Sequence, residues 1–136
     1  MTFRALAAGV VALMPDDDVA SHVGEVDEPS PALPWRLVSV QVPGVLERSR
    51  VSTPHARTCR VRVTIAARTQ DEALAVADST LGALEGSRPA AAGWVTGPLQ
   101  LRGDPAVYPT DVVLGGMTRH VFAAELPLVF AAQRQP

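Results

Sequence analysis

The sequence predicts an α+β fold, a mainly antiparallel sheet of four to five strands with two helices packed on one face. Three observations lead to this prediction. Apolar residues make up 47% of the chain and charged residues 19%, which is typical of a globular protein. Aromatic residues make up only 4%, so valine, leucine and alanine must build a thin core. The periodic segments follow the order helix, strands, helix, strands. We expect one domain over residues 1–136.

The first predicted element is a helix over residues 2–14, with Thr2 as its N-cap. The same apolar run resembles part of a secretion signal, but Pro15 and three aspartates follow it without a clear cleavage site, so we interpret it as a buried helix. We expect the aspartates at 16–18 to turn into solvent, because negative charge is unfavourable at a helix C-terminus. The predicted apolar face consists of Phe3, Leu6, Ala7, Val10 and Met14.

Two strands and two loops are predicted next. Residues 19–26 contain spaced valines and predict a short strand, whereas residues 27–34 contain three prolines and predict an extended loop. Residues 35–42 alternate, with valines on one face and Leu37 on the other, as in a half-buried strand. Residues 45–54 show no clear period and predict a long loop, of a kind that is often functional or ordered by a partner.

A strand predicted at residues 56–67 runs directly into a second helix. Thr69 and Glu72 form a capping box, in which the Thr69 hydroxyl binds the Glu72 amide and Glu72 reaches back, and Gly86 suits the helix end. The inward face of the strand consists of Cys59, Val61, Val63, Ile65 and Ala67, and the outward face of Arg60, Arg62, Thr64, Ala66 and Arg68. The apolar stripe predicted for the helix is Ala73, Leu74, Ala77, Leu81 and Leu84.

The C-terminal third predicts two further strands. Residues 94–101 indicate a short strand interrupted by Gly97 and Pro98. Residues 103–116 are expected to be mostly loop, with residues 112–114 entering a strand early. Residues 118–130 alternate again, with His120 on the apolar face. Pro127 cannot donate to a strand ladder, which favours an edge position or a local break there.

Side chains able to carry chemistry are few and scattered. His22, His55 and His120 have no partner at metal-ligand spacing, and the single Cys59 can form no zinc pattern or intramolecular disulfide. Cys59 and His120 are interpreted as packed or rim side chains. Phosphate-binding, GxSxG and HExxH motifs are absent from the sequence. We therefore expect no enzyme, no metal and no cofactor, with a small ligand-binding or hydrolytic domain as the alternative from another class.

Charge and face composition indicate a protein partner. The formal net charge of −2 gives no support for nucleic-acid binding as the main function. The outward row of Arg60, Arg62 and Arg68 is either a solvated strand face or an interface for carboxylates of a neighbour. Apolar residues also occupy the second face of the predicted sheet, which indicates either further helix cover or subunit contact. They are Leu37, Val121, Ala123 and Val129.

The strand-to-helix junction from Cys59 to Ala73 carries a family resemblance, together with the N-terminal helix, the proline-rich stretch and the long final strand. This layout resembles the tail terminator proteins of long-tailed, siphovirus-type bacteriophages of GC-rich actinobacteria. All twelve basic residues are arginine, and the alanine, valine, glycine and proline content also indicates a GC-rich genome. The resemblance covers nearly the whole chain as a pattern of elements, and neck proteins of similar size share that pattern.

The resemblance implies a structural role without catalytic residues. Tail terminators form a ring, commonly of six subunits, at the head-proximal end of the tail tube, in the neck of a virion assembled in the host cytoplasm. The ring ends tube polymerisation and joins the tail to the head connector. Its implied partners are like copies, the tail tube protein and the connector or head-closure protein, with DNA only passing through and no membrane. A head-closure or head-tail adaptor protein is the alternative. We expect the interface to include Arg60, Arg62, Arg68, Val45, Leu46, Glu47, Arg48 and Arg50.

Overall fold

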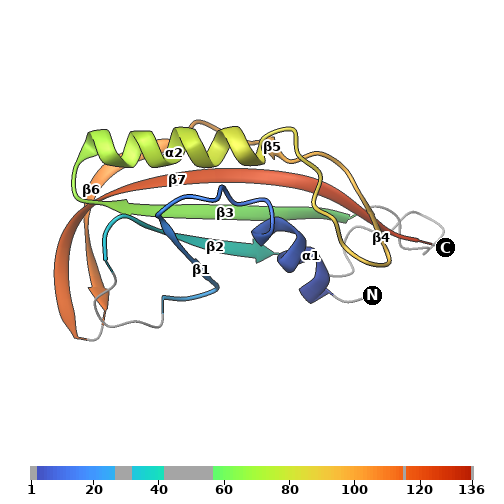
Figure 1. The fold of residues 1–136 in the computed structure, drawn as a ribbon, viewed down its shortest axis with the longest axis horizontal. Coiled ribbons are helices and arrows are strands. Elements are labelled where there is room, and N and C mark those ends of the chain that lie inside the picture. Colours follow the sequence, from blue (N-terminus) through green and yellow to red (C-terminus); the bar gives the residue numbers. More distant parts are fainter. Residues whose placement is uncertain (1–2, 27–31, 42–56, 115, 136) are drawn as a thin grey trace.

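Residues 3–26, 32–41, 57–114 and 116–135 are described by a computed structural model, in which they form two helices and one seven-stranded sheet (Figure 1). The elements in chain order are α1 (Phe3–Val11), β1 (Ala20–Val23), β2 (Trp35–Gln41), β3 (Arg57–Ala67), α2 (Gln70–Leu84), β4 (Trp94–Thr96), β5 (Gln100–Leu101), β6 (Ala106–Leu114) and β7 (Met117–Arg134). The predicted α+β class is confirmed.

Strand β7 organises the sheet. One of its edges pairs with β3, and its other edge is shared by β4, β5 and β6 in succession. Strand β2 pairs antiparallel with β3, and β1 pairs parallel with β2, so the sheet is mixed but mostly antiparallel. The sheet has more strands than the four to five expected, because the chain after α2 contributes three separate strands to one edge of β7.

Both helices pack on one face of the sheet, which we call the inward face. Leu6 and Val10 of α1 join a single core cluster with buried side chains of α2, such as Ala77 and Leu84. All five residues predicted to face inward on β3 are buried in this cluster. In Figure 1, α2 runs along β7 and β3, whereas α1 lies toward the end of the sheet where β2 ends. The core is built mainly from valine, leucine and alanine, as composition predicted.

Helix α1 is shorter than predicted and is positioned by a glycine. It ends at Val11 rather than at residue 14. A Cβ atom at Gly9 would lie 2.5 Å from the carbonyl oxygen of Ala90, so only glycine lets the chain after α2 pass this close. Phe3, predicted to be buried, is 46% exposed instead. Across the described residues, no helix is long and apolar enough to cross a membrane.

The three aspartates after α1 are exposed, as expected, but the Asp17 carboxylate also forms an ion pair. Its Oδ2 atom lies 2.7 Å from Nη2 of Arg36, whose side chain is fully buried on the inward side of β2. A buried guanidinium needs a counter-charge, and Asp17 supplies it from the segment after α1. Ser21 of β1 adds a longer contact of 3.4 Å to Nη1 of Arg36. The ion pair thus fastens this segment to the sheet.

The cap of α2 is confirmed, and its buried stripe is shifted from the prediction. The Thr69 hydroxyl accepts a hydrogen bond from the Glu72 amide at 3.1 Å, and Glu72 reaches back to the amide of Arg68 at 3.0 Å, one residue before the cap. Leu74 is 48% exposed, contrary to the prediction, because the helix turns a line of other residues toward the sheet. That buried line consists of Ala73, Val76, Ala77, Thr80 and Leu84.

The prediction of a mostly looped segment over residues 103–116 is wrong, because β6 begins at Ala106 and forms a long hairpin with β7; only the strand expected at residues 112–114 is confirmed. Strand β7 is interior, so Pro127 does not mark an edge. The alternative, a local break, is correct: strand pairing along one edge of β7 is interrupted at Pro127, between β5 and β6. The Pro127 carbonyl accepts a hydrogen bond from the Arg102 amide at 2.8 Å, between β5 and β6. The N–H that proline lacks would point to this same side, where no strand pairs with it.

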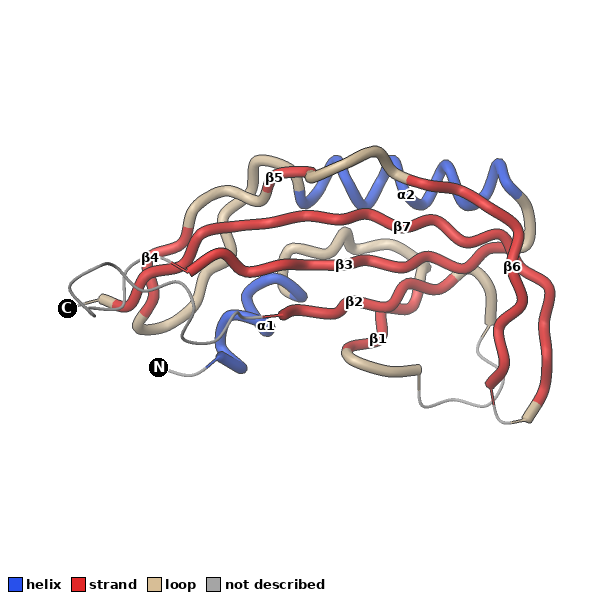
Figure 2. Tube along the Cα trace, turned by 180° about the vertical axis from the view of Figure 1, so that it is seen from behind, coloured by secondary structure: helices blue, strands red, loops and turns tan. Residues whose placement is uncertain are grey.

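The opposite face of the sheet, which we call the outer face, is divided into two parts. Near the root of the β6–β7 hairpin, a second cluster of Trp35, Ala66 and Val121 is buried. The chain around Val26 and Leu33 packs against it, so cover comes from the β1–β2 connection and the hairpin. Seen from behind in Figure 2, β2, β3 and β7 run side by side beyond this region, and the helices lie on the other side. The remaining part of the outer face is open.

Candidate functional site

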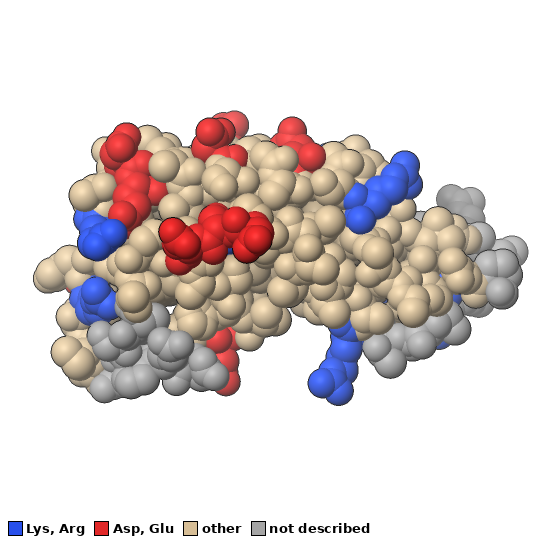
Figure 3. Space-filling view, in the orientation of Figure 1, with Lys and Arg blue, Asp and Glu red and all other residues tan. Residues whose placement is uncertain are grey.

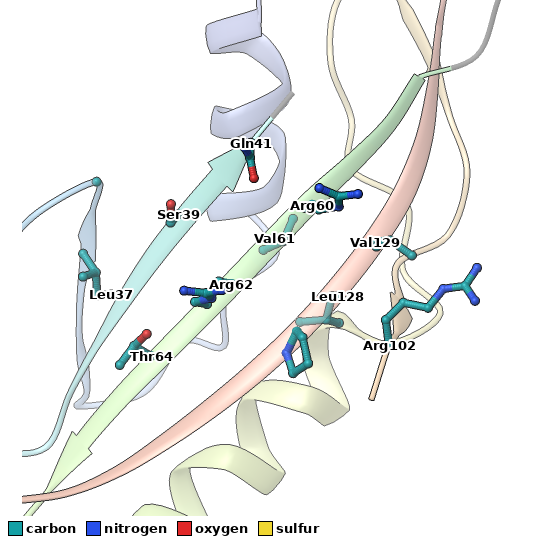
Figure 4. A pocket seen from close by; sticks show the side chains of 12 residues that line it. Leu37, Ser39, Gln41, Arg60, Val61, Arg62, Thr64, Arg102, Leu128 and Val129 are labelled. Atoms are coloured by element: carbon teal, nitrogen blue, oxygen red, sulfur yellow. The ribbon is translucent and has the colours of Figure 1, made fainter. Parts of the chain in front are cut away.

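The open part of the outer face holds a shallow hollow of about 470 Å³, which we call the arginine hollow. It lies across β2, β3 and β7 and is edged by the segment after β5 (Figure 4). Its lining residues are Gly24, Leu37, Ser39, Gln41, Arg60, Val61, Arg62, Thr64, Arg102, Pro127, Leu128 and Val129. Cationic side chains stand at its centre and rim, and neutral polar and aliphatic side chains surround them.

Alternation along β3 places Arg60 and Arg62 in the middle of the hollow. Both side chains are exposed, whereas Cys59, Val61 and Val63, which alternate with them along the strand, are buried. In register, Arg62 lies between Ser39 of β2 and Pro127 of β7. Neither arginine forms an ion pair with a carboxylate of the described residues. Their guanidinium groups are therefore available to an anionic partner, within the part of the chain that the structure covers.

Arg102 is a third cation that the sequence does not single out. Its amide binds the Pro127 carbonyl, so it stands in the same row as Arg62 with β7 between them. Figure 4 shows its side chain extending from the far side of β7. The pairing of the two-residue strand β5 with β7 brings it there. So short a strand has no periodicity to detect, and the sequence therefore offers no signal for Arg102.

One acidic residue, Glu125, lies next to the hollow, opposite Thr64 in the strand register. Burial, and then the neighbouring Glu125 carboxylate, raise the pKa of the Tyr108 hydroxyl. Glu125 also makes a side-chain hydrogen bond with that hydroxyl, and Arg62 is close enough to oppose the shift. Glu125 thus has a local partner in Tyr108. The open face as a whole remains cationic.

The structure separates Arg68 from the other two predicted arginines. Arg68 lies beyond the opposite end of β3, where Nη2 binds Oε2 of Glu72 at 2.9 Å. Hydrogen bonds from Arg68 lower the pKa of Glu72. This arginine therefore already has an acidic partner at the start of α2. The other predicted interface residues, Val45, Leu46, Glu47, Arg48 and Arg50, lie outside the described residues.

The β6–β7 hairpin forms a second candidate surface. Residues 110–114 and 117–121 pair beyond the body of the sheet and bend away from it (Figures 1 and 2). We call them the hairpin arm. Val113 and Met117 are 65% and 58% exposed on it. These exposed aliphatic side chains on a projecting hairpin make the arm a candidate for contact with another chain.

Cys59 and the described histidines do not assemble a reactive centre. Cys59 is buried, as predicted. His22 packs edge-on against Trp35, and His120 is exposed on the hairpin arm beside Asp111, with which it interacts through Nδ1. His55 lies outside the described residues. Among the residues that the structure covers, no group of three or more histidine, cysteine, aspartate or glutamate side chains could hold a metal ion.

A sheet with one face filled by helices and the other presenting unpaired arginines is suited to binding other protein chains. The comparison with known families agrees with this class. The family described as "Tail completion protein gp17" matches residues 8–122, and the chain belongs to this family. It is a structural family of phage tail completion that is not known to be enzymatic. The protein is therefore a phage tail component with a role in tail assembly. No curated protein matches the chain.

Proposed function

We propose that the protein is the tail terminator of a long-tailed phage. In this role, copies of the chain form a ring, of six subunits in our proposal, at the head-proximal end of the tail tube. The ring ends polymerisation of the tube protein and joins the finished tail to the head connector in the neck of the virion. DNA passes through the ring, and the work of the protein is binding.

The observation that carries this proposal is the open arginine hollow on a chain of the tail completion family. A ring subunit must contact like copies on two sides, the tube below and the connector above. It therefore needs several separate contact surfaces. The described residues offer three: the arginine hollow, the hairpin arm and the exposed side of α2.

Electron microscopy of particles made without this protein tests the proposal. A phage with the gene deleted should produce tails of uncontrolled length, because nothing stops addition of tube subunits. Supplying the unchanged protein from a plasmid should restore uniform tails. Finished tails of normal length beside unsealed heads would instead establish a head-closure or adaptor role and would refute tail termination.

The hairpin arm supplies a matched pair of variants for the same assay. Val113→Ser and Met117→Ser remove exposed aliphatic surface and are expected to leave the fold intact. If the arm contacts the tube or the connector, these variants restore fewer complete particles than the unchanged protein does. Val95→Ser, on a valine of β4 that is 55% exposed, is the control. Equal complementation by all three variants would exclude the arm from the contact.

A further inference from the structure

We propose that the arginine hollow of one copy receives the exposed side of α2 from a second copy, in a head-to-tail contact. The inference rests on the proposed function and names the surfaces through which neighbouring ring subunits meet. Such a contact is heterologous, with different patches on the two partners, and it closes into a ring when the rotation per copy suits.

Three acidic residues form a stripe on the exposed side of α2. Asp71 and Asp78 belong to α2, Glu85 is its C-cap residue, and the three are spaced by seven residues and exposed. Seven residues are almost two helical turns, so the three side chains stay on one side of the helix, about 10.5 Å apart along its axis. Helical geometry places this acidic stripe well away from the buried line through Ala77 and Leu84.

The acidic stripe is unpaired within the chain as far as the structure describes it. Glu72 belongs to the same helix, but it is bound to Arg68, whereas none of the three stripe residues forms an ion pair with a described residue. Figure 3 shows acidic side chains following α2 and gathering on the front of the molecule, with arginine confined to its margins. The helix side is therefore acidic, and the outer face of the sheet is cationic.

Spacing and surroundings of the two patches also agree. Arg62 and Arg102 stand in one row with β7 between them, which separates their backbones by two strand spacings, or about 9.6 Å. This is close to the interval of about 10.5 Å between successive acids of the stripe. Ala75 and Gly82 lie between those acids and are exposed, so the outward side of α2 is low enough to enter a shallow hollow.

Apolar contact adds to the charge match. Leu74 flanks the acidic stripe with 48% of its surface exposed, so it offers apolar area next to the acids. The hollow offers Leu37 and Val129, which are half-buried, beside its arginines. A contact of guanidinium, carboxylate and aliphatic groups favours a protein partner over a phosphate backbone. The net charge of −2 also favours a protein partner over DNA.

Charge reversal with rescue tests the contact in the deletion phage. Arg60→Glu/Arg62→Glu reverses the hollow, Asp78→Arg/Glu85→Arg reverses the stripe, and a third variant carries all four changes and regains the net charge of −2. We expect each reversal alone to lower the number of normal-length tails by at least about tenfold, because like charges would face each other. The combined variant should recover most of that loss.

Arg4→Glu/Arg88→Glu is the control for the hollow reversal. It removes the same charge from exposed arginines outside the hollow, and it should complement normally. All variants are first checked for native circular dichroism and an unchanged melting temperature. Normal tails with the hollow reversed alone and with the stripe reversed alone, in a phage whose deletion strain has abnormal tails, would overturn the contact and leave tail termination standing. Normal tail length in the deletion strain would instead refute tail termination, the proposed function.

The combined variant also separates the other occupants of the hollow. Suppose that the four-change variant folds and still gives as few normal tails as the hollow reversal alone. In that case the hollow contacts a different chain and the inference is wrong. Normal tails that fail only in DNA delivery would assign the hollow to phosphate and would equally overturn it.

Cross-linking gives a direct readout on assembled tails. Arg62→Cys and Asp78→Cys in the same chain place a thiol in each patch, while the natural Cys59 is buried and unreactive toward large reagents. A bifunctional maleimide should then link neighbouring copies into a ladder. Neither Arg62→Cys alone nor Asp78→Cys alone should give a ladder. Absence of the ladder on tails that carry the protein would contradict the inference.

Discussion

The two faces of one strand show how this molecule separates stability from contact. On β3, the side chains of Val61, Val63 and Ile65 point inward and are buried against the helices. Arg60 and Arg62 alternate with them, point outward and make no ion pair within the described chain. A β-strand gives successive side chains to opposite faces, so the outward positions can be chosen for a partner without disturbing the core.

Strand β7 offers the strongest test of that comparison. Leu128 faces inward and is buried, while its neighbour Val129 faces outward and lines the hollow. Leu128→Ala should lower the free energy of unfolding by about 2–5 kcal/mol, because it removes apolar burial and leaves a cavity. Val129→Ala should cost less than about 1 kcal/mol. Chemical denaturation of both variants gives the two values, and similar losses would mean that the outer face carries stability too.

The buried arginine is an exception on the inward face. Asp17→Ala removes the partner of Arg36 and should lower the free energy of unfolding by about 2–3 kcal/mol, because a buried guanidinium then lacks a counter-charge. Asp17 is partly exposed, so the loss should be smaller than for a fully buried pair. Asp17→Ala/Arg36→Met removes both charges and should regain much of that loss. Thermal unfolding compares the variants, with Asp18→Ala as an exposed control. A cost for Asp17→Ala no larger than that of Asp18→Ala would show that the pair contributes nothing.

Periodicity was sufficient to predict the elements that have one polar and one apolar side. The faces of β3 and the cap of α2 follow from residue spacing alone, since alternation and a Thr-x-x-Glu pattern each have a local physical cause. The prediction failed for β6, where Pro109 and Asp111 lower strand propensity and pairing with β7 overrides it. The predicted apolar stripe of α2 included Leu74, because periodicity does not distinguish the buried line of a helix from the line of residues next to it.

The candidate site was only partly predictable, because strand pairing brings its residues together. Arg60 and Arg62 were found from their place on one strand face. Arg102 joins them only through the register of β5 on β7, and Asp17 meets Arg36 only because α1 packs beside β2. Contacts between distant segments leave no mark on local composition. The sequence alone also grouped Arg68 with the others, although it pairs with Glu72 at the far end of β3.

The helix cap gives a smaller effect that depends on pH. Thr69→Ala should cost about 1 kcal/mol, because the amide of Glu72 loses its acceptor. Glu72 has a lowered pKa in the folded chain, so its contribution is present above its ordinary value of 4.5 and is lost as pH falls through the folded pKa. Glu72→Gln should therefore destabilise at pH 7 and matter less at acidic pH. Denaturation at both pH values checks this, and Glu85→Gln, at the opposite end of α2 from Thr69, should not be destabilised at either pH.

The smallest effect on stability is expected where the largest effect on assembly is proposed. Arg60→Ala/Arg62→Ala removes two exposed like charges about 6.8 Å apart along β3, within one screening length at physiological salt. Their repulsion is unfavourable in the isolated chain, so the free energy of unfolding should change by less than about 0.5 kcal/mol, or rise slightly at low salt. Unfolding at low and high salt measures this, because screening should stabilise the unchanged protein more than the variant. A loss above about 1 kcal/mol would show that the arginines support the fold itself. In that case the exposure of these two arginines would no longer indicate that they serve to bind a partner.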